Sequence, residues 1–259
     1  MTVNIIGSGN VATHLTMTLK VKGYEIKGIA SRNIDNARSL ADKVDATVMV
    51  TYPGNLLPAD MTVIAVSDSA ISEVREGMYD VEQLRDGIIV HTSGATPMSV
   101  LSPFEHHGVL YPCMTFTKGD DIDMTKCPFL VEASDAGTYN ALAEVADTIG
   151  AGATPCDSEG RRRLHLAAVL ASNFTNHLML KAEQVLKEAS LPLSILEPLV
   201  RQTIDKAFRM PPFDAQTGPA RRNDTQTMER HREIIGDDER LREIYDVLSR
   251  SIGETYKNE

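Results

Sequence analysis

The sequence predicts an α/β domain built on a doubly wound parallel sheet, followed by an all-α C-terminal domain. In the first half, short runs rich in Val and Ile alternate with helical stretches, as in successive β-α-β units. Several of these runs are continuously apolar, which is typical of strands covered on both faces of a parallel sheet. After Cys156 the runs give way to helix formers. We therefore place the boundary near residue 155, between domains at 1–154 and 155–259.

The expected elements follow this division. Strands are predicted at Val3–Ile6, Ile26–Ala30, Thr47–Val50, Thr62–Val66, Ile88–His91, Val109–Leu110 and Phe129–Val131. Helices between them are predicted at Val11–Lys22, Ile34–Lys43, Ser69–Tyr79 and Ala136–Ile149. The second domain is predicted to contain helices at Leu164–Ala189, Leu193–Phe208, Thr225–Ile235 and Asp238–Glu254. Prolines and a glycine within residues 210–219 predict a loop.

Composition and charge exclude several classes of protein. Of the 259 residues, 42% are hydrophobic and 24% charged, which argues against a disordered chain, collagen or a coiled-coil rod. Because no apolar run approaches the roughly 18 residues of a membrane-spanning helix, we expect no membrane partner. The 36 acidic and 26 basic residues give a net charge of −10. This acidic surplus makes nucleic acid a poor partner.

The cysteines, histidines and first residues predict a cytoplasmic protein without a metal site. Cys113, Cys127 and Cys156 are odd in number and form no C-x-x-C pair, so we expect reduced, structural thiols. His106 and His107 lack further ligands at metal-binding spacing. The chain enters its first strand without the basic region of a signal peptide.

A glycine-rich turn joins the first predicted strand to the first predicted helix. Gly7-Ser8-Gly9-Asn10-Val11-Ala12 matches the G-x-G-x-x-A fingerprint of dinucleotide-binding Rossmann domains. Gly7 permits the tight turn, Gly9 lets the backbone approach a pyrophosphate, and Ala12 allows close packing of the helix on the strand. The free N–H groups at the helix start favour phosphates. An ordinary glycine turn is the alternative, but the position of the motif favours a dinucleotide.

The tip of the second predicted strand favours NADP over NAD. An NAD-binding domain usually carries a carboxylate there for the ribose 2′-hydroxyl, whereas this chain has Ser31, Arg32 and Asn33. Arg32 can pair with the 2′-phosphate of NADP, and Ser31 and Asn33 can donate hydrogen bonds to the same oxygens. The alternative is that Arg32 is a solvated loop residue. We therefore expect NADP as the cofactor.

The fourth predicted strand ends where ligands of such sheets bind. Val66, Ser67 and Asp68 follow this strand, so we expect them to flank a ribose of the cofactor. Asp68 can instead be the N-cap of the next helix.

Polar residues also end the fifth predicted strand, near the expected position of the nicotinamide. We assign Ser93 to the cofactor and His91, Thr92 and Gly94 to the substrate. A polar turn without a ligand is the alternative, since Ser-Gly is a common turn pair.

Polar residues interrupt the apolar helix predicted from residue 164. At about 100° per residue, His165, Ser172 and Asn176 fall on one stripe, with Asn173 near its edge. Such groups find partners in a core or line a wet cleft. In a cleft, His165 can give a proton as hydride reaches a carbonyl or imine carbon. We take His165, Ser172 and Asn173 as candidate catalytic residues; a hydrogen-bonded core histidine is the alternative.

Arginines near this helix and in a later loop allow more than one interpretation. The run Arg161-Arg162-Arg163 is expected to form a solvated cap, with phosphate binding as the alternative. In the polar loop at residues 217–224, Arg222 can anchor a substrate carboxylate or form a salt bridge between domains. Asp224 or Thr225 is expected to cap the helix that follows.

Together these motifs give the chain a family resemblance. Beside the glycine turn and Ser-Arg-Asn, they are His91-Thr92-Ser93-Gly94, Tyr111-Pro112-Cys113-Met114-Thr115-Phe116, His165 with Ser172-Asn173, and Thr217-Gly218-Pro219 with Arg222 and Asp224. Nearly the whole chain resembles NADP-binding oxidoreductases related to F420-dependent NADP reductase and pyrroline-5-carboxylate reductase. More narrowly, it resembles a bacterial family that joins a Rossmann-like domain to a domain of unknown function. The resemblance implies a helical domain of the 6-phosphogluconate dehydrogenase C-terminal type and a dimer formed through the helices.

The resemblance supplies no substrate. The β-hydroxyacid dehydrogenases of the wider group carry a Lys on this helix with an Asn four residues later, whereas here Val169 stands four residues after His165 and the nearest Asn is Asn173. This departure argues against a 3-hydroxy acid dehydrogenase, and no proline-pathway signature is evident.

The sequence thus predicts an NADP-dependent oxidoreductase. Hydride would pass between NADP(H) and a small metabolite bound between the two domains of a homodimer. The alternative is a sensor or scaffold protein that binds NADP without transferring hydride.

Overall fold

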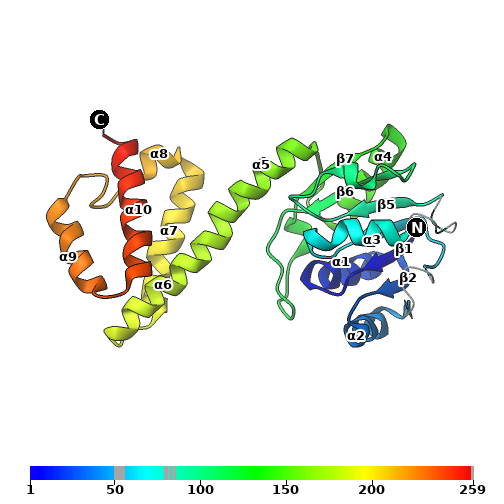
Figure 1. The fold of residues 1–259 in the computed structure, drawn as a ribbon, viewed down its shortest axis with the longest axis horizontal. Helices are drawn as coiled ribbons and strands as arrows, with labels where there is room; N and C mark the ends of the chain where they lie inside the picture. Colours follow the sequence, from blue (N-terminus) through cyan, green and yellow to red (C-terminus); the bar gives the residue numbers. More distant parts are fainter. Residues whose placement is uncertain (50–55, 79–80, 82–83, 85, 258–259) are drawn as a thin grey trace. The chain divides into compact units, whose positions relative to one another are not determined.

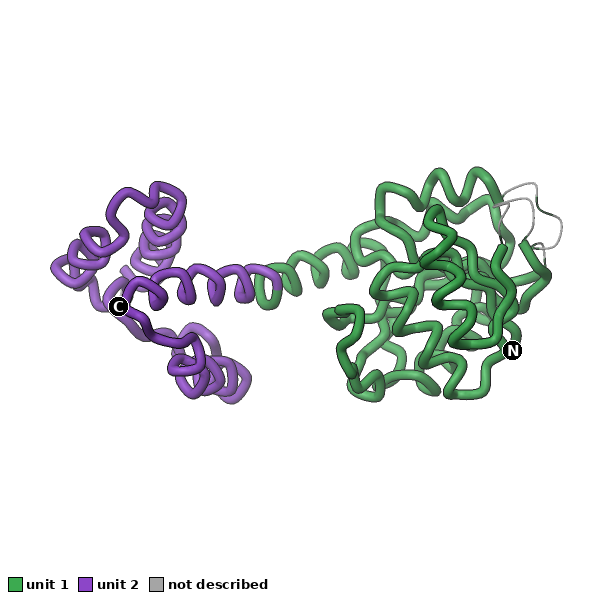
Figure 2. The backbone as a smooth tube through the Cα atoms, turned by 90° about the horizontal axis from the view of Figure 1, so that it is seen from below, with its two compact units in different colours: residues 1–172 green, residues 173–259 purple. Residues whose placement is uncertain are grey.

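The computed structural model describes residues 1–49, 56–78, 81, 84 and 86–257. The chain divides into two compact units, residues 1–172 and 173–259 (Figure 2). The predicted domain boundary at residues 154–155 lies inside unit 1 and stays a prediction. Two predicted element ends, at Val50 and Tyr79, lie outside the described residues.

Unit 1 is built around one sheet (Figure 1). Its strands are β1 (Thr2–Ile6), β2 (Glu25–Ala30), β3 (Thr47–Val48), β4 (Met61–Ile64), β5 (Ile88–His91), β6 (His107–Pro112), β7 (Phe129–Ala133) and β8 (Ala153–Pro155). They lie in the order β3-β2-β1-β4-β5-β6-β7-β8, and every pair from β3 to β6 is parallel. The run from β3 to β6 has the strand order of a Rossmann fold.

The last two strands depart from the prediction of a wholly parallel sheet. β7 runs antiparallel to β6, with Leu110 opposite Val131, and β8 pairs in parallel with β7. A side chain at Gly108 would overlap the carbonyl oxygen of Glu132, so glycine lets β6 and β7 approach. β8 was not predicted because it has three residues and ends in Pro155, a residue that is confined to strand edges and ends.

The helices of unit 1 are α1 (Asn10–Val21), α2 (Ile34–Val44), α3 (Ile71–Met78), α4 (Ala136–Ile149) and α5 (Ser158–Ala168), with short 3-10 turns η1 (Asp68–Ala70), η3 (Met98–Leu101) and η4 (Met124–Lys126). The prediction that the long helix starts at Leu164 was wrong. α5 begins at Ser158, because the side chain of Asp157 accepts a hydrogen bond from Gly160 N at 2.7 Å and caps its first turn.

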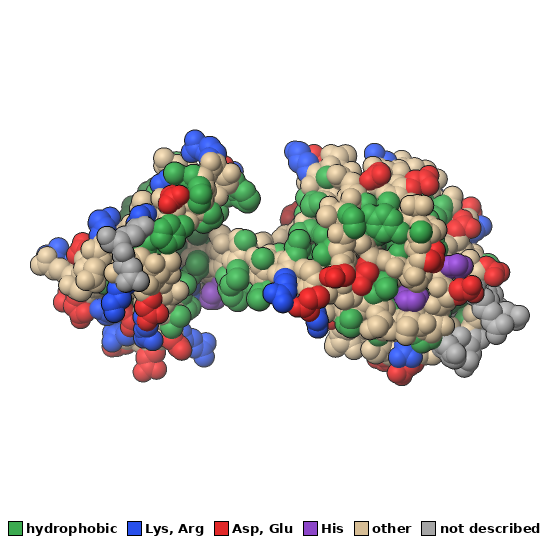
Figure 3. All heavy atoms as spheres, turned by 90° about the horizontal axis from the view of Figure 1, so that it is seen from above, with side chains coloured by type: hydrophobic (Ala, Val, Ile, Leu, Met, Phe, Trp, Pro, Cys, Tyr) green, Lys and Arg blue, Asp and Glu red, His purple; other side chains and the backbone are tan. Residues whose placement is uncertain are grey.

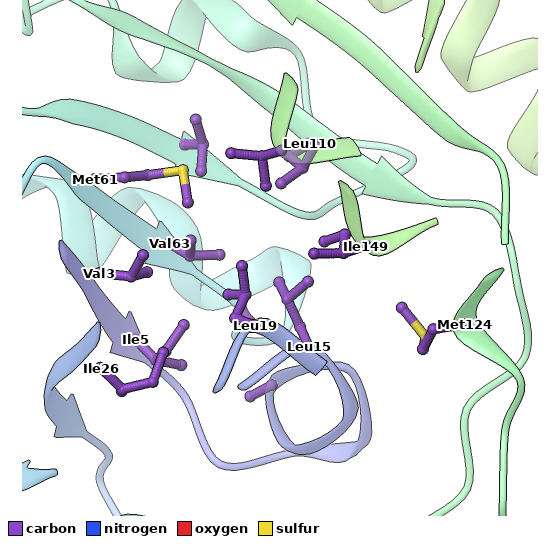
Figure 4. Close-up of a cluster of buried hydrophobic side chains, with 14 of the residues drawn as sticks. Val3, Ile5, Leu15, Leu19, Ile26, Met61, Val63, Leu110, Met124 and Ile149 are labelled. Atoms are coloured by element: carbon purple, nitrogen blue, oxygen red, sulfur yellow. The ribbon is translucent and has the colours of Figure 1, made fainter. Parts of the chain in front are cut away.

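Alternate residues of the central strands build two buried clusters, one on each face of the sheet. Val3 and Ile5 of β1 belong to the first cluster with residues of α1, α2 and α4 (Figure 4), whereas Ile6 belongs to the second with residues of α3 and η3. The same alternation separates Val63 from Ile64 in β4. Because both faces are covered, the carboxyl ends of the parallel strands are the edge at which ligands of this fold bind.

Unit 2 is helical in its described residues. After a π-helical turn, η5 (Val169–Asn173), come α6 (Phe174–Glu188), η6 (Leu193–Leu196), α7 (Glu197–Arg209), α8 (Pro212–Ala215), α9 (Thr225–Ile235) and α10 (Glu239–Thr255). The helix predicted at Leu164–Ala189 is therefore the end of α5, the π turn and α6. The predicted loop at 210–219 was wrong in part, because α8 begins within it at Pro212, where a proline suits the start of a helix. The predicted fold class is confirmed.

Unit 2 buries little apolar surface within itself. None of the described residues after Arg161 is buried. Large apolar side chains stand at its surface, among them Leu199, Phe208 and Ile234, which are 60%, 89% and 64% exposed. Figure 3 shows hydrophobic side chains at this surface between charged ones. Described residues of the chain include no helix long and apolar enough to span a membrane.

Candidate active site

The turn between β1 and α1 has the shape that the glycine motif predicts. Gly7 adopts a φ of 131°, and a side chain there would overlap the carbonyl oxygen of Ala65. Gly9 is the N-cap of α1, and an added Cβ would meet no atom of the described chain within 4 Å. Ala12 is fully buried against the sheet. The open space at Gly9 and the first N–H groups of α1 therefore form a cradle that fits a pyrophosphate.

The other polar residues of this turn have partners. Ser8 Oγ lies 2.7 Å from Ser31 Oγ, which joins the turn to the tip of β2. Asn10 Nδ2 donates to the carbonyl of Phe116 at 2.8 Å, so this side chain ties α1 to the segment after β6. Val11 is half-buried and packs against the first core cluster. The turn thus offers its backbone, more than these side chains, to a ligand.

At the tip of β2, Ser31 and Asn33 are engaged in hydrogen bonds within the described chain, whereas Arg32 is not. Ser31 Oγ accepts from Asn33 N at 3.3 Å, and Asn33 Oδ1 accepts from Asn36 N at 3.0 Å to cap α2. Arg32 stands between them, exposed, and has no ion-pair or hydrogen-bond partner among the described residues. Its guanidinium is therefore available to an anionic group.

The segment after β4 is exposed at the same edge of the sheet. Val66 is half-buried, whereas Ser67 and Asp68 are exposed. Ser67, and not Asp68, is the N-cap of the 3-10 turn η1, so the alternative reading of Asp68 as that cap was wrong. Ser67 Oγ lies 3.4 Å from Ser69 Oγ.

The residues that end β5 form a closed turn above a buried histidine. His91 is fully buried, its Nδ1 accepts from Ser93 N at 3.1 Å, and its Nε2 has no partner among the described residues. Burial, reinforced by the charge of Arg161, lowers the pKa of His91 to about 4, so the ring is neutral at pH 7. Thr92 is also buried, and its N–H donates to Ile64 at 3.2 Å.

The hydroxyl of Ser93 is used within this turn. It donates to Thr96 Oγ1 at 3.0 Å and accepts from the N–H groups of Ala95 and Thr96 at 3.1 and 2.9 Å. A contact of Ser93 with a cofactor stays a prediction. Because the Ser93 hydroxyl is already hydrogen-bonded within the turn, such a contact would depend on the shape of the turn and not on the hydroxyl.

Arg161 fastens α5 to the same turn. Its side chain is fully buried, with Nε donating to Ser93 O at 3.2 Å and Nη2 to Thr96 O at 2.7 Å. Nη1 pairs with the carboxylate of Glu132, and Ser158 Oγ also donates to that carboxylate at 2.7 Å. The expectation of a solvated cap was therefore wrong for Arg161.

The next two arginines do form an exposed cap. Arg162 and Arg163 are exposed and both pair with Glu159. Arg161 lies four residues before His165 and so shares its helix face, a spacing that could have distinguished it from its neighbours.

One helical turn beyond Arg161, His165 lies on the turn at the end of β5. A Cβ on Gly94 would meet His165 Nδ1 at 2.6 Å and Tyr111 Cζ at 3.0 Å, so the missing side chain makes room for both rings. Tyr111 Oη lies 3.3 Å from His165 Nδ1, and the rings meet edge to face with centroids 6.1 Å apart. Tyr111, at the end of β6, was quoted only for the family resemblance and was not assigned to the site.

The other candidate catalytic residues lie at the end of unit 1 and the start of unit 2. Ser172 Oγ is 3.2 Å from Thr115 Oγ1, in the segment that Asn10 also binds. Asn173 is exposed and is the first residue of unit 2. Arg222 is exposed within unit 2, where Asp224 caps α9 by accepting from Thr227 N at 3.0 Å, as one of the two predicted caps. The roles of Ser172, Asn173 and Arg222 stay predictions.

Comparison with known proteins finds a matching family model for each half of the chain. Residues 1–115 match the model of a Rossmann-like domain, and residues 127–252 match that of a domain of unknown function, DUF2520. A putative NADP oxidoreductase from Bacteroides fragilis is 37% identical over 98% of each chain, with a TM-score of 0.91. The chain belongs to the same family as this protein, with a Rossmann-like domain followed by a DUF2520 domain. The family resemblance inferred from the sequence is confirmed.

More distant members of the fold share the architecture. Protein TM1727 from Thermotoga maritima is 24% identical over 97% of this chain and 99% of its own, with a TM-score of 0.75. An imine reductase from Myxococcus stipitatus, in complex with NADP+, is 16% identical over 99% and 94%, with a TM-score of 0.73. A search of curated proteins finds no match.

Proposed function

We propose that this protein is an NADP-dependent oxidoreductase. The observation that carries the proposal is an open glycine turn at α1 together with an exposed Arg32 at the tip of β2. Arg32 has no partner among the described residues, and the two features suit the pyrophosphate and the 2′-phosphate of one dinucleotide. The relatives support it. The protein from Bacteroides fragilis is described as a putative NADP oxidoreductase, and a reductive aminase of the same fold from Aspergillus terreus binds NADPH.

The residues around the turn would hold this cofactor as follows. Gly7, Gly9 and the N–H groups of Asn10, Val11 and Ala12 would bind the pyrophosphate. Arg32, with Ser31 and Asn33, would bind the 2′-phosphate. Val66, Ser67 and Asp68 would flank a ribose, and the turn at Ser93 would lie beside the nicotinamide. When bound, NADPH supplies hydride.

The protein's own chemistry centres on His165. Its ring lies at Gly94, at the carboxyl end of β5, where ligands of this fold bind. His165 would give a proton to the oxygen or nitrogen atom of the group that is reduced. His91 lies below the turn, fully buried, so it would shape the site from beneath. A substrate site shared by the two domains, and a cytoplasmic location, stay predictions from the sequence.

The exposed apolar surface of unit 2 supports a homodimer. A groove of about 520 Å³ in this unit is lined by Met179, Leu196, Val200 and Ile204 among other residues. Because no residue of unit 2 up to Lys257 is buried, its apolar faces lie in water, and a second copy of the same surface would cover them. We therefore propose that unit 2 pairs with unit 2 of another chain.

Turnover separates an oxidoreductase from a protein that only binds NADP. Purified protein with NADPH should oxidise the cofactor when mixed with pooled ketones, aldehydes and cyclic imines, followed at 340 nm. His165→Ala should lower this rate by about 100-fold or more, the range of general acid catalysis, with NADPH affinity unchanged. His177→Ala, on the same run of helix, is the matched control. Binding of NADPH without oxidation by any pool would favour the sensor or scaffold.

A further inference from the structure

Tyr111 and His165 form a pair that the proposed function leaves unexplained. Tyr111 Oη lies 3.3 Å from His165 Nδ1, with the rings at 74° to each other. Both rings rest on Gly94, where any larger residue would push them apart. The Tyr111 hydroxyl thus lies next to Nδ1 of His165, the ring nitrogen that faces Gly94.

The surroundings of Tyr111 decide which atom carries the proton. Burial, together with the neighbouring Cys113 thiol, raises the pKa of Tyr111 to about 12, so its hydroxyl keeps its proton at ordinary pH. Burial also raises the pKa of Cys113, so the neighbouring thiol keeps its proton as well. The protonated Tyr111 hydroxyl can donate to His165 Nδ1, which lies 3.3 Å away. A neutral imidazole that accepts at Nδ1 carries its hydrogen at Nε2.

We propose that Tyr111 is a positioning residue that holds His165 in the Nε2–H tautomer and reloads it with a proton. This inference rests on the proposed function of His165 as the acid. As charge develops on the oxygen or nitrogen atom of a C=O or C=N group, that atom takes the Nε2 proton. Nδ1 takes the Tyr111 proton, so the imidazole stays neutral but carries its hydrogen at Nδ1. The pair is restored when Nε2 takes a proton from water and the Nδ1 proton returns to the tyrosinate oxygen. The pair thereby favours substrates that offer a neutral hydrogen-bond acceptor at the reacting carbon.

Arg161 agrees with this substrate class. It is the cation that lies on the His165 face of α5, one turn away, but it is fully buried and bound to Ser93 O, Thr96 O and Glu132. It therefore cannot reach a substrate carboxylate.

The tautomer can be measured without any substrate. Nitrogen-15 spectra of the full-length, histidine-labelled protein distinguish Nδ1–H from Nε2–H, and a His165→Gln variant assigns the His165 signals. We expect the Nε2–H form in the parent protein and a mixture of both forms in Tyr111→Phe, which keeps the ring but removes the hydroxyl. An Nδ1–H form in the parent protein, or an unchanged His165 spectrum in Tyr111→Phe, would overturn the inference.

The chain contains a matched control for this measurement. In unit 2, Tyr245 Oη lies 2.9 Å from His231 Nδ1, with the rings edge to face at 84°. Tyr245→Phe should change the His231 signals and leave those of His165 unchanged. Because the spectra need neither cofactor nor turnover, they distinguish failure of the pair from failure of the oxidoreductase proposal.

Kinetics supply the second readout. With a substrate found among the pooled carbonyl and imine compounds, Tyr111→Phe should lower kcat at least tenfold with little change in KM or NADPH affinity. The solvent deuterium isotope effect on kcat should change with it, because one of the two protons in flight is lost. An unchanged kcat would contradict the reloading role.

Discussion

Arg161 illustrates how one side chain can join a helix to a strand end. Its guanidinium binds two carbonyl groups of the turn after β5 and the carboxylate of Glu132, and Ser158 completes the group. Of these partners Ser93 is buried, and Thr96, Glu132 and Ser158 are half-buried. Because His165 follows on the same face of α5, the position of that ring on Gly94 depends on this attachment.

Removing the charge of Arg161 should therefore destabilise the fold strongly. Arg161→Met leaves Glu132 without its ion-pair partner and two carbonyl groups without their donors, so we expect a loss of about 3–5 kcal/mol in the free energy of unfolding. Arg162→Met is the matched control, and we expect it to cost less than about 1 kcal/mol because its pair with Glu159 is exposed. Urea titrations followed by circular dichroism measure both. Equal losses in the two variants would show that Arg161 is not the attachment.

His91 should make stability depend on pH. Its pKa is lowered to about 4 in the folded protein, so folding favours the neutral ring. The stability it contributes is present above the unfolded pKa of about 6.5 and is lost as pH falls toward 4. Between pH 7 and 5 we expect a loss of about 2 kcal/mol. In His91→Asn, which can still accept from Ser93 N, this dependence should flatten; an equal slope in both proteins would rule His91 out as its source.

At the scale of elements, the two glycines of the β1–α1 turn serve different purposes: the fold requires one, and ligand binding would require the other. Gly7 and Gly9 belong to one motif but have different surroundings, since Ala65 crowds only Gly7. Gly9 has a φ of −76°, which any residue adopts. The fold therefore requires glycine at position 7 but not at position 9.

Alanine substitutions test this difference. Gly7→Ala should impair folding, because its φ of 131° and the Ala65 carbonyl both oppose a side chain. Gly9→Ala should fold like the parent protein but bind NADPH at least tenfold more weakly, because its Cβ would fill the pyrophosphate cradle. Thermal unfolding and NADPH titration of both variants measure the two effects. Full NADPH affinity in a folded Gly9→Ala protein would contradict the cradle.

The elements that could be predicted are those with local signals. β5, α4 and α9 have the predicted limits, because apolar runs and capping residues define them in the sequence. The direction of β7 and the existence of β8 depend on neighbouring strands, and no local pattern encodes either. The turn motif and His165 could be found from residue types at known strand and helix positions. Tyr111 and the burial of Arg161 could not, because both depend on contacts between segments about 50 or more residues apart.

At the scale of the whole molecule, the two units differ in how many of their apolar side chains are buried. Unit 1 buries two clusters, one on each face of its sheet, whereas no described residue of unit 2 is buried. Small helical units seldom remain stable with so much apolar surface in water. Pairing of two chains through unit 2 would explain why this unit has no buried residue among those described and why its large apolar side chains are exposed in a single chain.

Sedimentation equilibrium measures this association. We expect a dimer at micromolar concentration, and Leu199→Arg, which places a charge on the apolar surface of α7, should raise the dissociation constant at least tenfold. Val21→Arg is the control, since Val21 is 80% exposed but belongs to unit 1. A parent protein that is monomeric at these concentrations, or equal effects of both substitutions, would contradict association through unit 2.

Calorimetric titration with NADPH and with NADH, for the parent protein and Arg32→Ala, tests the central claim most directly. The 2′-phosphate gains a charged partner in Arg32, so NADPH should bind at least tenfold more tightly than NADH, and Arg32→Ala should remove that difference while leaving NADH affinity unchanged. Equal affinity for the two nucleotides in the parent protein, or binding of neither, would contradict the assignment of this site to NADP.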